Sequence, residues 1–156
     1  MPQFQVTIPE PQMDKSFSLW IEKIKAQSMV YINTDAFDSR QYKPVLMQGV
    51  AHARGTALPG EGKGNIYLFA HSTDTTLNIV RYNAVFFLLR KLEKGDQVVV
   101  YYQGKRYVYQ IFDKFITEGA DTRYLTRGSG PETLVLQTCW PPGTTWKRLL
   151  VLASPK

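Results

Sequence analysis

The chain has 156 residues, 44% of them apolar, and no low-complexity tract, which is the composition of one globular domain with a packed core. Its 19 Lys and Arg against 13 Asp and Glu give a net charge of +6, so an anionic partner such as nucleic acid, lipid or a cell envelope is compatible with its surface. The single cysteine excludes an internal disulfide framework, and no apolar run approaches the roughly 18 residues that span a bilayer.

Residues 1–16 are predicted to form an extended arm or the stub of a linker. They contain Pro2, Pro9 and Pro11 and show little periodicity. The opening stretch lacks the basic and apolar regions of a signal peptide, so the chain as written is expected to be soluble. An N-terminal anchor carried by a longer protein would be compatible with this sequence. Residues 17–156 are then expected to form the folded domain.

Strand periodicity begins at Phe17. In FSLWIEKI, alternate positions are apolar and face one side, and SMVYIN continues in the same manner. Residues 34–65 are rich in turn-forming residues and are interpreted as loops around a brief element near residues 45–50. A β-rich run, NIYLFAHS, then ends on His71.

The second half of the chain is also rich in strand patterns. Residues 83–92, NAVFFLLRKL, are predicted to be helical, and DQVVVYYQGKRYVYQIFDKFI reads as a hairpin that turns at Gln103 and Gly104. The connection over residues 113–132 is longer than a structural turn requires and is interpreted as a mobile substrate loop. The apolar strands TLVLQTC and KRLLVLA close the chain. Several short strands with one helix, without strand–helix alternation, favour a closed or nearly closed barrel over a parallel α/β sheet.

Three chemically distinctive residues lie at the ends of predicted elements. A short loop between antiparallel strands brings Cys139 and Arg148 to the same end of the sheet, and His71 ends an earlier strand. Cysteine offers a nucleophilic sulfur, histidine a proton for a departing amine, and arginine several N–H donors for an oxyanion. Together they specify acyl transfer through a thioester. The spacing leaves His52 as an alternative to His71, and a small buried hydrophobe as the alternative for the cysteine.

The protonation states required by this chemistry are rare at neutral pH. Because ordinary pKa values are about 8.5 for cysteine and 6.5 for histidine, thiolate and imidazolium would coexist in only about 1% of molecules near pH 7.5. Such an enzyme is slow unless its site stabilises the pair.

TLVLQTC followed by KRL resembles the TLxTC cysteine strand and the arginine strand of sortases, the surface transpeptidases of Gram-positive bacteria and related lineages. FSLWIEKIKAQSMVYIN is similar to their opening strands, GVAHARGTALPGEGKGNIYLFAHS to their histidine region, and FFLLRKLEKGDQVVV to their helix and following strand. The resemblance covers about residues 17–154. Two extra residues separate TL from TC here. The resemblance implies a mostly β fold, a closed eight-stranded barrel with one or two short helices.

The resemblance also implies roles for individual residues. By position, Cys139 would be the nucleophile, His71 the acid and base, and Arg148 the clamp for substrate and oxyanion. Thr138 would form part of the oxyanion pocket or contact the peptide. His52 matches a family histidine upstream of the catalytic one, which implies a supporting role.

The implied reaction is cleavage of an LPXTG-like sorting signal between Thr and Gly, followed by transfer of the acyl group to an amine of a cell-wall precursor or a pilin lysine. The implied location is the extracytoplasmic cell surface, through an anchor in the full-length protein, and the expected state is a monomer. No cofactor is expected: Asp113, Glu118 and Asp121 lie where some sortases bind calcium, without EF-hand spacing. Trp140 and Trp146 would either form an aromatic wall for the peptide or pack within the fold.

Two alternatives remain open from the sequence. A basic β-barrel with exposed aromatic residues could bind single-stranded nucleic acid, whereas the sortase hypothesis expects no nucleic-acid partner. A sortase-like barrel could also act as a slow hydrolase or as an inactive scaffold.

Overall fold

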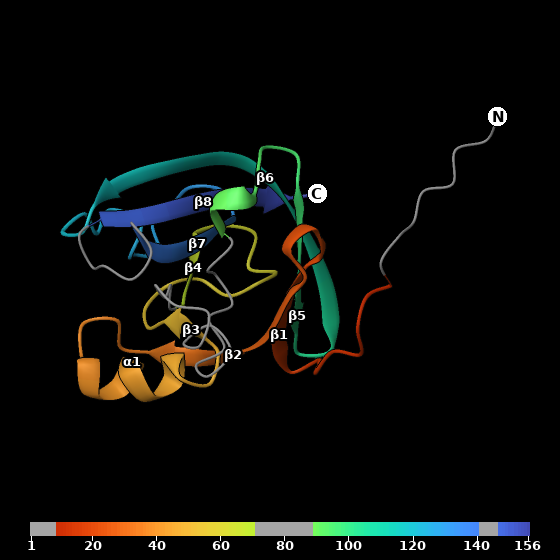
Figure 1. Cartoon of the computed structure of the whole chain (residues 1–156), viewed down its shortest axis with the longest axis horizontal. Coiled ribbons are helices and arrows are strands. Elements are labelled where there is room, and N and C mark those ends of the chain that lie inside the picture. Colours follow the sequence, from red (N-terminus) through yellow and green to blue (C-terminus); the bar gives the residue numbers. More distant parts are fainter. Residues whose placement is uncertain (1–8, 71–88, 141–146) are drawn as a thin grey trace.

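The computed structural model describes residues 9–70, 89–140 and 147–156, which form a closed eight-stranded barrel (Figure 1). The strand order around the barrel is β1-β2-β3-β4-β7-β8-β6-β5. The mostly β barrel predicted from the sequence is therefore confirmed. The strands are β1 (Phe17–Ile21), β2 (Ala26–Thr34), β3 (Val50–Ala53), β4 (Asn65–Phe69), β5 (Gln97–Tyr102), β6 (Lys105–Glu118), β7 (Thr133–Trp140) and β8 (Lys147–Pro155).

Short helical segments accompany the barrel. The α-helix α1 spans Ser39–Leu46, a 3₁₀ helix spans Glu22–Ile24, and residues 89–91 form a second 3₁₀ turn. The helix predicted over residues 83–92 lies outside the described residues except for its last part. Within the described ranges, no helix has the length and apolar character needed to cross a membrane.

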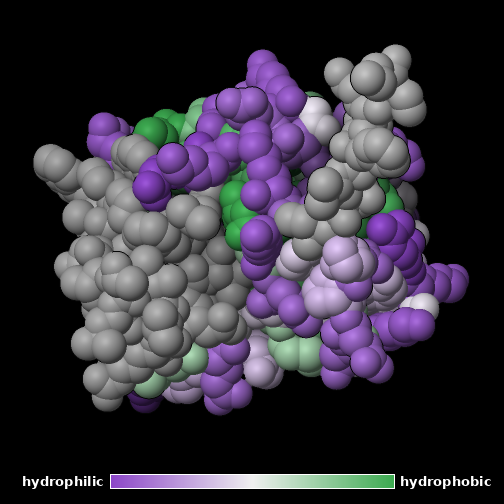
Figure 2. Space-filling view, turned by 45° about the vertical axis from the view of Figure 1, so that its right-hand side comes forward, coloured by the Kyte–Doolittle hydropathy of each residue, from purple (hydrophilic) through white to green (hydrophobic). Residues whose placement is uncertain are grey.

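Apolar residues lie on both sides of the barrel wall. One cluster takes residues from all eight strands and fills the interior, with Leu134 and Leu136 as examples on β7. A second cluster lies on the opposite faces of β3, β4, β7 and β8, as Val135 shows, because neighbouring residues in a strand point to opposite sides. Leu46 of α1 and Leu125 of the β6–β7 connection pack on this outer cluster. The face shown in Figure 2 is mostly hydrophilic where it is described.

The helix α1 occupies sequence that was interpreted as loop. Pro44 lies inside it and its first six residues are polar, aromatic or proline, so the local pattern favours a turn. The helix begins where the Asp38 carboxylate accepts the backbone N–H of Arg40, an N-cap. Contact of Tyr42 and Leu46 with the outer cluster then stabilises it. Tertiary packing thus overrides a weak local preference.

The hairpin predicted at Gln103 and Gly104 is present. Both residues have positive φ, 49° and 81°, as a two-residue turn of the I′ type requires, and β5 and β6 pair from Tyr102 and Lys105 onward. At this turn, the backbone N–H groups of Gln103 and Gly104 also donate to the carbonyls of Ser16 and Lys15.

The connection between β6 and β7 is tied to the connection between β3 and β4. Backbone N–H groups of Gly64 and Asn65 donate to the carbonyls of Gly130 and Arg127 at 2.8 and 2.6 Å, and Arg127 forms an ion pair with Glu61 at 3.0 Å. The segment interpreted as a mobile substrate loop is therefore held at its second half by hydrogen bonds and a salt bridge.

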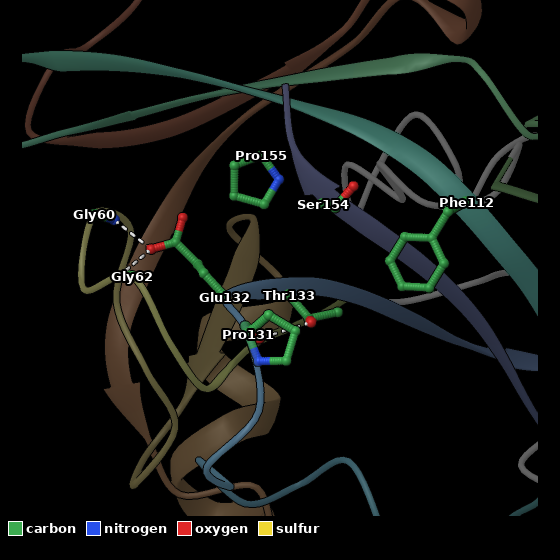
Figure 3. A pocket seen from close by; sticks show the side chains of 8 residues that line it. All are labelled: Gly60, Gly62, Phe112, Pro131, Glu132, Thr133, Ser154 and Pro155. Carbon is green, nitrogen blue, oxygen red and sulfur yellow. Dashed lines mark hydrogen bonds between the residues drawn. The ribbon is translucent and has the colours of Figure 1, made fainter.

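The buried carboxylate of Glu132 closes this junction (Figure 3). Its Oε1 accepts the backbone N–H groups of Gly60 and Gly62, both at 2.9 Å, and its Oε2 accepts the hydroxyl of Tyr109 at 3.0 Å. Figure 3 shows Glu132 on one side of an apolar hollow at the start of β7, with Phe112 on the other side. The hollow lies at the opposite end of β7 from Cys139.

Candidate active site

The end of β7 and the start of β8 bring Cys139 and Arg148 together. The two strands are antiparallel neighbours, and these residues are direct cross-strand partners. Partners in register share one face of a sheet, and Gln137 lies on that face as well because it is two residues away along β7. The thiol and the guanidinium therefore belong to the outer face of the barrel wall, not to its interior.

A pocket of about 280 Å³ opens at this position. Its described lining comes from α1 and the residues before it, the end of β4, the β6–β7 connection, and strands β7 and β8: Ala36, Tyr42, Lys43, Leu46, Phe69, Ala70, Gly119, Leu125, Gln137, Cys139, Lys147 and Arg148. Apolar side chains from three separate segments form one part of the wall. The remaining wall includes Gln137 and Cys139 together with two lysines and one arginine, and no carboxylate is among these lining residues.

Cys139 is half-buried and, as the one cysteine of the chain, forms no internal disulfide. Burial raises the pKa of the Cys139 thiol above its ordinary value, and the nearby positive charge of Arg148 lowers it by a smaller amount. The neutral thiol is therefore the main form at neutral pH. A base is required to remove its proton when it attacks a substrate.

Arg148 forms a hydrogen bond with Tyr67 of β4. Its Nη1 donates to the Tyr67 hydroxyl at 3.4 Å, and this hydroxyl donates in turn to Oε1 of Gln137 at 3.2 Å. Tyr67 is 2% exposed, and burial is the main reason that the pKa of its phenol rises to about 12. Sequence reasoning missed Tyr67, because only the pairing of β4 with β7 brings it near an arginine of β8.

His52 lies fully buried in β3 with both ring nitrogens bonded. Its Nδ1 accepts the backbone N–H of Asn33 at 3.2 Å, so the ring proton lies on Nε2, which is 2.9 Å from the carbonyl oxygen of Ala57 and 3.0 Å from the hydroxyl of Thr56. Burial lowers the pKa of His52, which keeps the ring neutral. These contacts hold the turn after β3, and the supporting role that the resemblance implies for His52 remains a prediction.

Thr138 points away from the thiol. Its hydroxyl is buried and donates to the carbonyl of Ala70 at 3.3 Å, while the backbone N–H of Ala70 donates to the carbonyl of Gln137 at 3.2 Å. The end of β4 is thereby fixed beside the end of β7. His71 follows Ala70 and lies outside the described residues, as do the side chain of Trp140 and the whole of Trp146. The roles expected of His71, Thr138 and Trp140 remain predictions.

The acidic residues considered for calcium have other partners or lie apart. The Asp121 carboxylate accepts the backbone N–H and two guanidinium N–H groups of Arg123, the shortest at 2.7 Å, and the hydroxyl of Thr117 at 2.6 Å. These bonds hold the pKa of Asp121 well below its usual range. Asp113 and Glu118 are on β6, and no group of three or more possible metal ligands occurs within the described part of the chain. The expectation that the protein needs no cofactor stays a prediction.

The fold and this site define a closed β-barrel whose outer wall pairs a thiol with a guanidinium at a pocket. The family model of the sortase domain matches residues 19–156. Sortase D of Bacillus subtilis (strain 168) is 32% identical over 123 residues, which are 79% of this chain and 53% of that protein. The chain therefore belongs to the sortase family, and it spans about half the length of this curated relative.

Solved structures agree with this assignment. Sortase C-1 from Actinomyces oris has a TM-score of 0.76 and 28% identity, with coverage of 92% of this chain and 75% of that chain. The Sortase D5 transpeptidase of Clostridium perfringens has a TM-score of 0.72 and 25% identity, with coverage of 92% and 79%.

Proposed function

We propose that this chain is a cysteine transpeptidase that cleaves an LPXTG-like sorting signal and transfers the acyl group to an amine. The observation that carries the proposal is the direct cross-strand pairing of Cys139 with Arg148 at the wall of a pocket. Sortases are transpeptidases, and family membership supports the same class of reaction for this chain.

The first half of the reaction forms a thioester. The Cys139 sulfur attacks the carbonyl carbon of the signal's threonine, and its proton passes to His71, the base assigned by resemblance. Arg148 donates hydrogen bonds to the carbonyl oxygen as it becomes an oxyanion. Collapse of this intermediate breaks the C–N bond, and the imidazolium protonates the departing amine of glycine. The products are the acyl-enzyme and the released C-terminal fragment.

The second half regenerates the thiol. An acceptor amine attacks the thioester carbonyl, gives a proton to His71, and expels the Cys139 sulfur, which recovers a proton. A new amide bond replaces the broken one. With water as the acceptor, the same steps give a carboxylic acid, which is the slow hydrolase alternative.

The pocket supplies apolar contacts for the signal. Leu46, Phe69 and Leu125 come from three segments and line the same pocket as the thiol. An apolar leucine or proline of a peptide would bury surface against them, worth about 25 cal/mol per Å² of apolar area. The hydrogen bonds that hold the β6–β7 connection reduce the ordering cost of this binding.

The partners proposed for this chain are surface proteins with a sorting signal and an amine acceptor of the cell wall or a pilin. Sortases are cell-surface-associated enzymes. We propose the same location here, with anchoring by a membrane segment of the full-length protein. The proposed functional unit is a monomer without a resident cofactor.

The test is intact-mass measurement after incubation with a small library of LPXTG-like peptides. The wild type is expected to gain the mass of the acyl fragment, and an added amine should remove it as a peptide–amine product. Cys139→Ala should show neither. Arg148→Lys should acylate about tenfold more slowly, because an ammonium lacks the planar fork of donors. Equal acylation of wild type and Cys139→Ala would end the proposal.

The nucleic-acid alternative is tested in parallel. It predicts tight binding of single strands at low salt, with affinity that falls steeply as salt increases, and no role for the thiol. Such binding together with no adduct for any peptide would favour it over acyl transfer.

A further inference from the structure

Two successive hydrogen bonds at Tyr67 link three strands of the barrel. Arg148 of β8 donates to the Tyr67 hydroxyl of β4, and that hydroxyl donates to Gln137 of β7. Tyr67 and Gln137 are both buried, at 2% and 8% exposed, so water does not compete freely for these bonds. A buried tyrosine with both its donor and its acceptor positions used has a fixed hydroxyl orientation.

The phenol leaves the charge of Arg148 intact. A carboxylate in this place would hold the guanidinium more strongly, but it would also neutralise the charge that has to stabilise an oxyanion. A neutral hydroxyl orients the guanidinium without cancelling its field. The proton of Tyr67 is committed to Gln137, which leaves an oxygen lone pair directed to Arg148.

The tyrosine is placed for this purpose by strand register. β4 and β7 are parallel neighbours, with Tyr67 beside Val135 and Phe69 beside Gln137. Val135, Gln137 and Cys139 share one face of β7, so the phenol lies under the same face that carries the thiol. The ring of Phe69, at a centroid distance of 6.3 Å, packs beside that of Tyr67.

We propose that Tyr67, held by Gln137, is a positioning residue that keeps the Arg148 guanidinium beside Cys139 in the orientation required by the substrate carbonyl. The 3.4 Å bond to Arg148 is long, and catalytic hydrogen bonds of this kind commonly shorten when substrate is bound. This inference rests on the proposed acyl-transfer function for its kinetic consequence, but the position of the guanidinium has a consequence without any substrate.

That consequence is the reactivity of the only cysteine. Arg148 lowers the pKa of the Cys139 thiol, so a guanidinium released from Tyr67 favours the thiolate less. Lys43 and Lys147 also line the pocket and are unchanged in the variants below. Alkylation by iodoacetamide followed by intact mass reports on Cys139 alone, because the chain contains one cysteine.

The experiment compares Tyr67→Phe with Tyr101→Phe, each alone and the former also in an Arg148→Met background. Tyr101 is a matched control: it is buried, its hydroxyl also donates one hydrogen bond, to Glu10 at 2.6 Å, and it lies on β5. Thermal unfolding of each variant confirms that it folds. If Tyr67→Phe does not fold, Gln137→Met removes the acceptor of the Tyr67 proton and is expected to act in the same direction.

We expect Tyr67→Phe to move the pH midpoint of alkylation upward, Tyr101→Phe to leave it unchanged, and Tyr67→Phe to add nothing once Arg148 is methionine. With a peptide that acylates the wild type, the single-turnover rate of thioester formation should fall about tenfold while KM changes less than about twofold. Additive effects in the Arg148→Met background, or a Tyr67→Phe midpoint equal to that of the wild type, would overturn the inference. If the alkylation midpoints shift as expected but no peptide acylates the wild type, the proposed function is overturned and the positioning role of Tyr67 remains supported.

Discussion

Replacement of Glu132 by glutamine tests whether one buried carboxylate secures the junction between the β3–β4 and β6–β7 connections. The carboxylate accepts three hydrogen bonds, from the N–H groups of Gly60 and Gly62 and from the hydroxyl of Tyr109 (Figure 3). Glutamine has the same shape, but it removes the negative charge and replaces one accepting oxygen by an NH₂ donor. The substitution therefore isolates charge and acceptor capacity from packing.

The expected loss follows from the three bonds. A hydrogen bond to a charged group contributes about 1.5–3 kcal/mol, against about 0.5–1.5 kcal/mol for a neutral one, so Glu132→Gln should lower the free energy of unfolding by about 2–3 kcal/mol. Glu132→Ala also leaves the buried Tyr109 hydroxyl without its acceptor and should cost more, about 4–5 kcal/mol. For a chain of this length, the glutamine variant should melt about 5–10 °C below the wild type.

The assay is urea denaturation at pH 7 with a parallel thermal scan. Glu93→Gln is the control, because the Glu93 side chain is 76% exposed and its 3.6 Å contact with Lys23 is an exposed ion pair. Its effect should stay within about 0.5 kcal/mol. A change for Glu132→Gln as small as that of the control would refute the idea that a charge-assisted anchor stabilises this junction.

Three further predictions concern ionisation and charge. Burial holds the pKa of His52 below its unfolded value of about 6.5, so the wild type should lose stability relative to His52→Gln as the pH falls below about 6.5. Above that pH, the difference in unfolding free energy between the two proteins should be constant. Urea midpoints from pH 5 to 8 check this, and a difference that is constant over the whole range would contradict it. Because burial raises the pKa of the Cys139 thiol, iodoacetamide should alkylate it with a midpoint above that of N-acetylcysteine, and a lower midpoint would show that the site activates the thiolate. Lys43 is exposed at the pocket, so sorting signals with an acidic variable residue should react about two- to fivefold faster than signals with lysine there. Lys43→Ala or high salt should remove this preference. Equal kcat/KM values for acidic and basic signals would argue against contact of the variable residue with Lys43.

The sequence determined the strand content and the partnership of Cys139 with Arg148. Alternation of apolar residues is a local signal, so β1, β7 and β8 were recognisable, and the turn at Gln103 and Gly104 follows from residues that tolerate positive φ. A short connection between two antiparallel strands leaves few registers, which is why the thiol and the guanidinium were expected at one end of the sheet.

Only the tertiary structure decided how the rest of the site is assembled. The parallel pairing of β4 with β7 joins segments that are far apart in the chain. No local sequence pattern predicts that this pairing brings Tyr67 within hydrogen-bond distance of Arg148. The helix α1 forms despite Pro44 because its apolar side chains gain burial on the outer face of the barrel. The neutral state of His52 likewise depends on Asn33 and Ala57, which bond its two nitrogens in the fold. Local periodicity specifies which segments become strands, whereas burial and non-local hydrogen bonds specify what each side chain meets there.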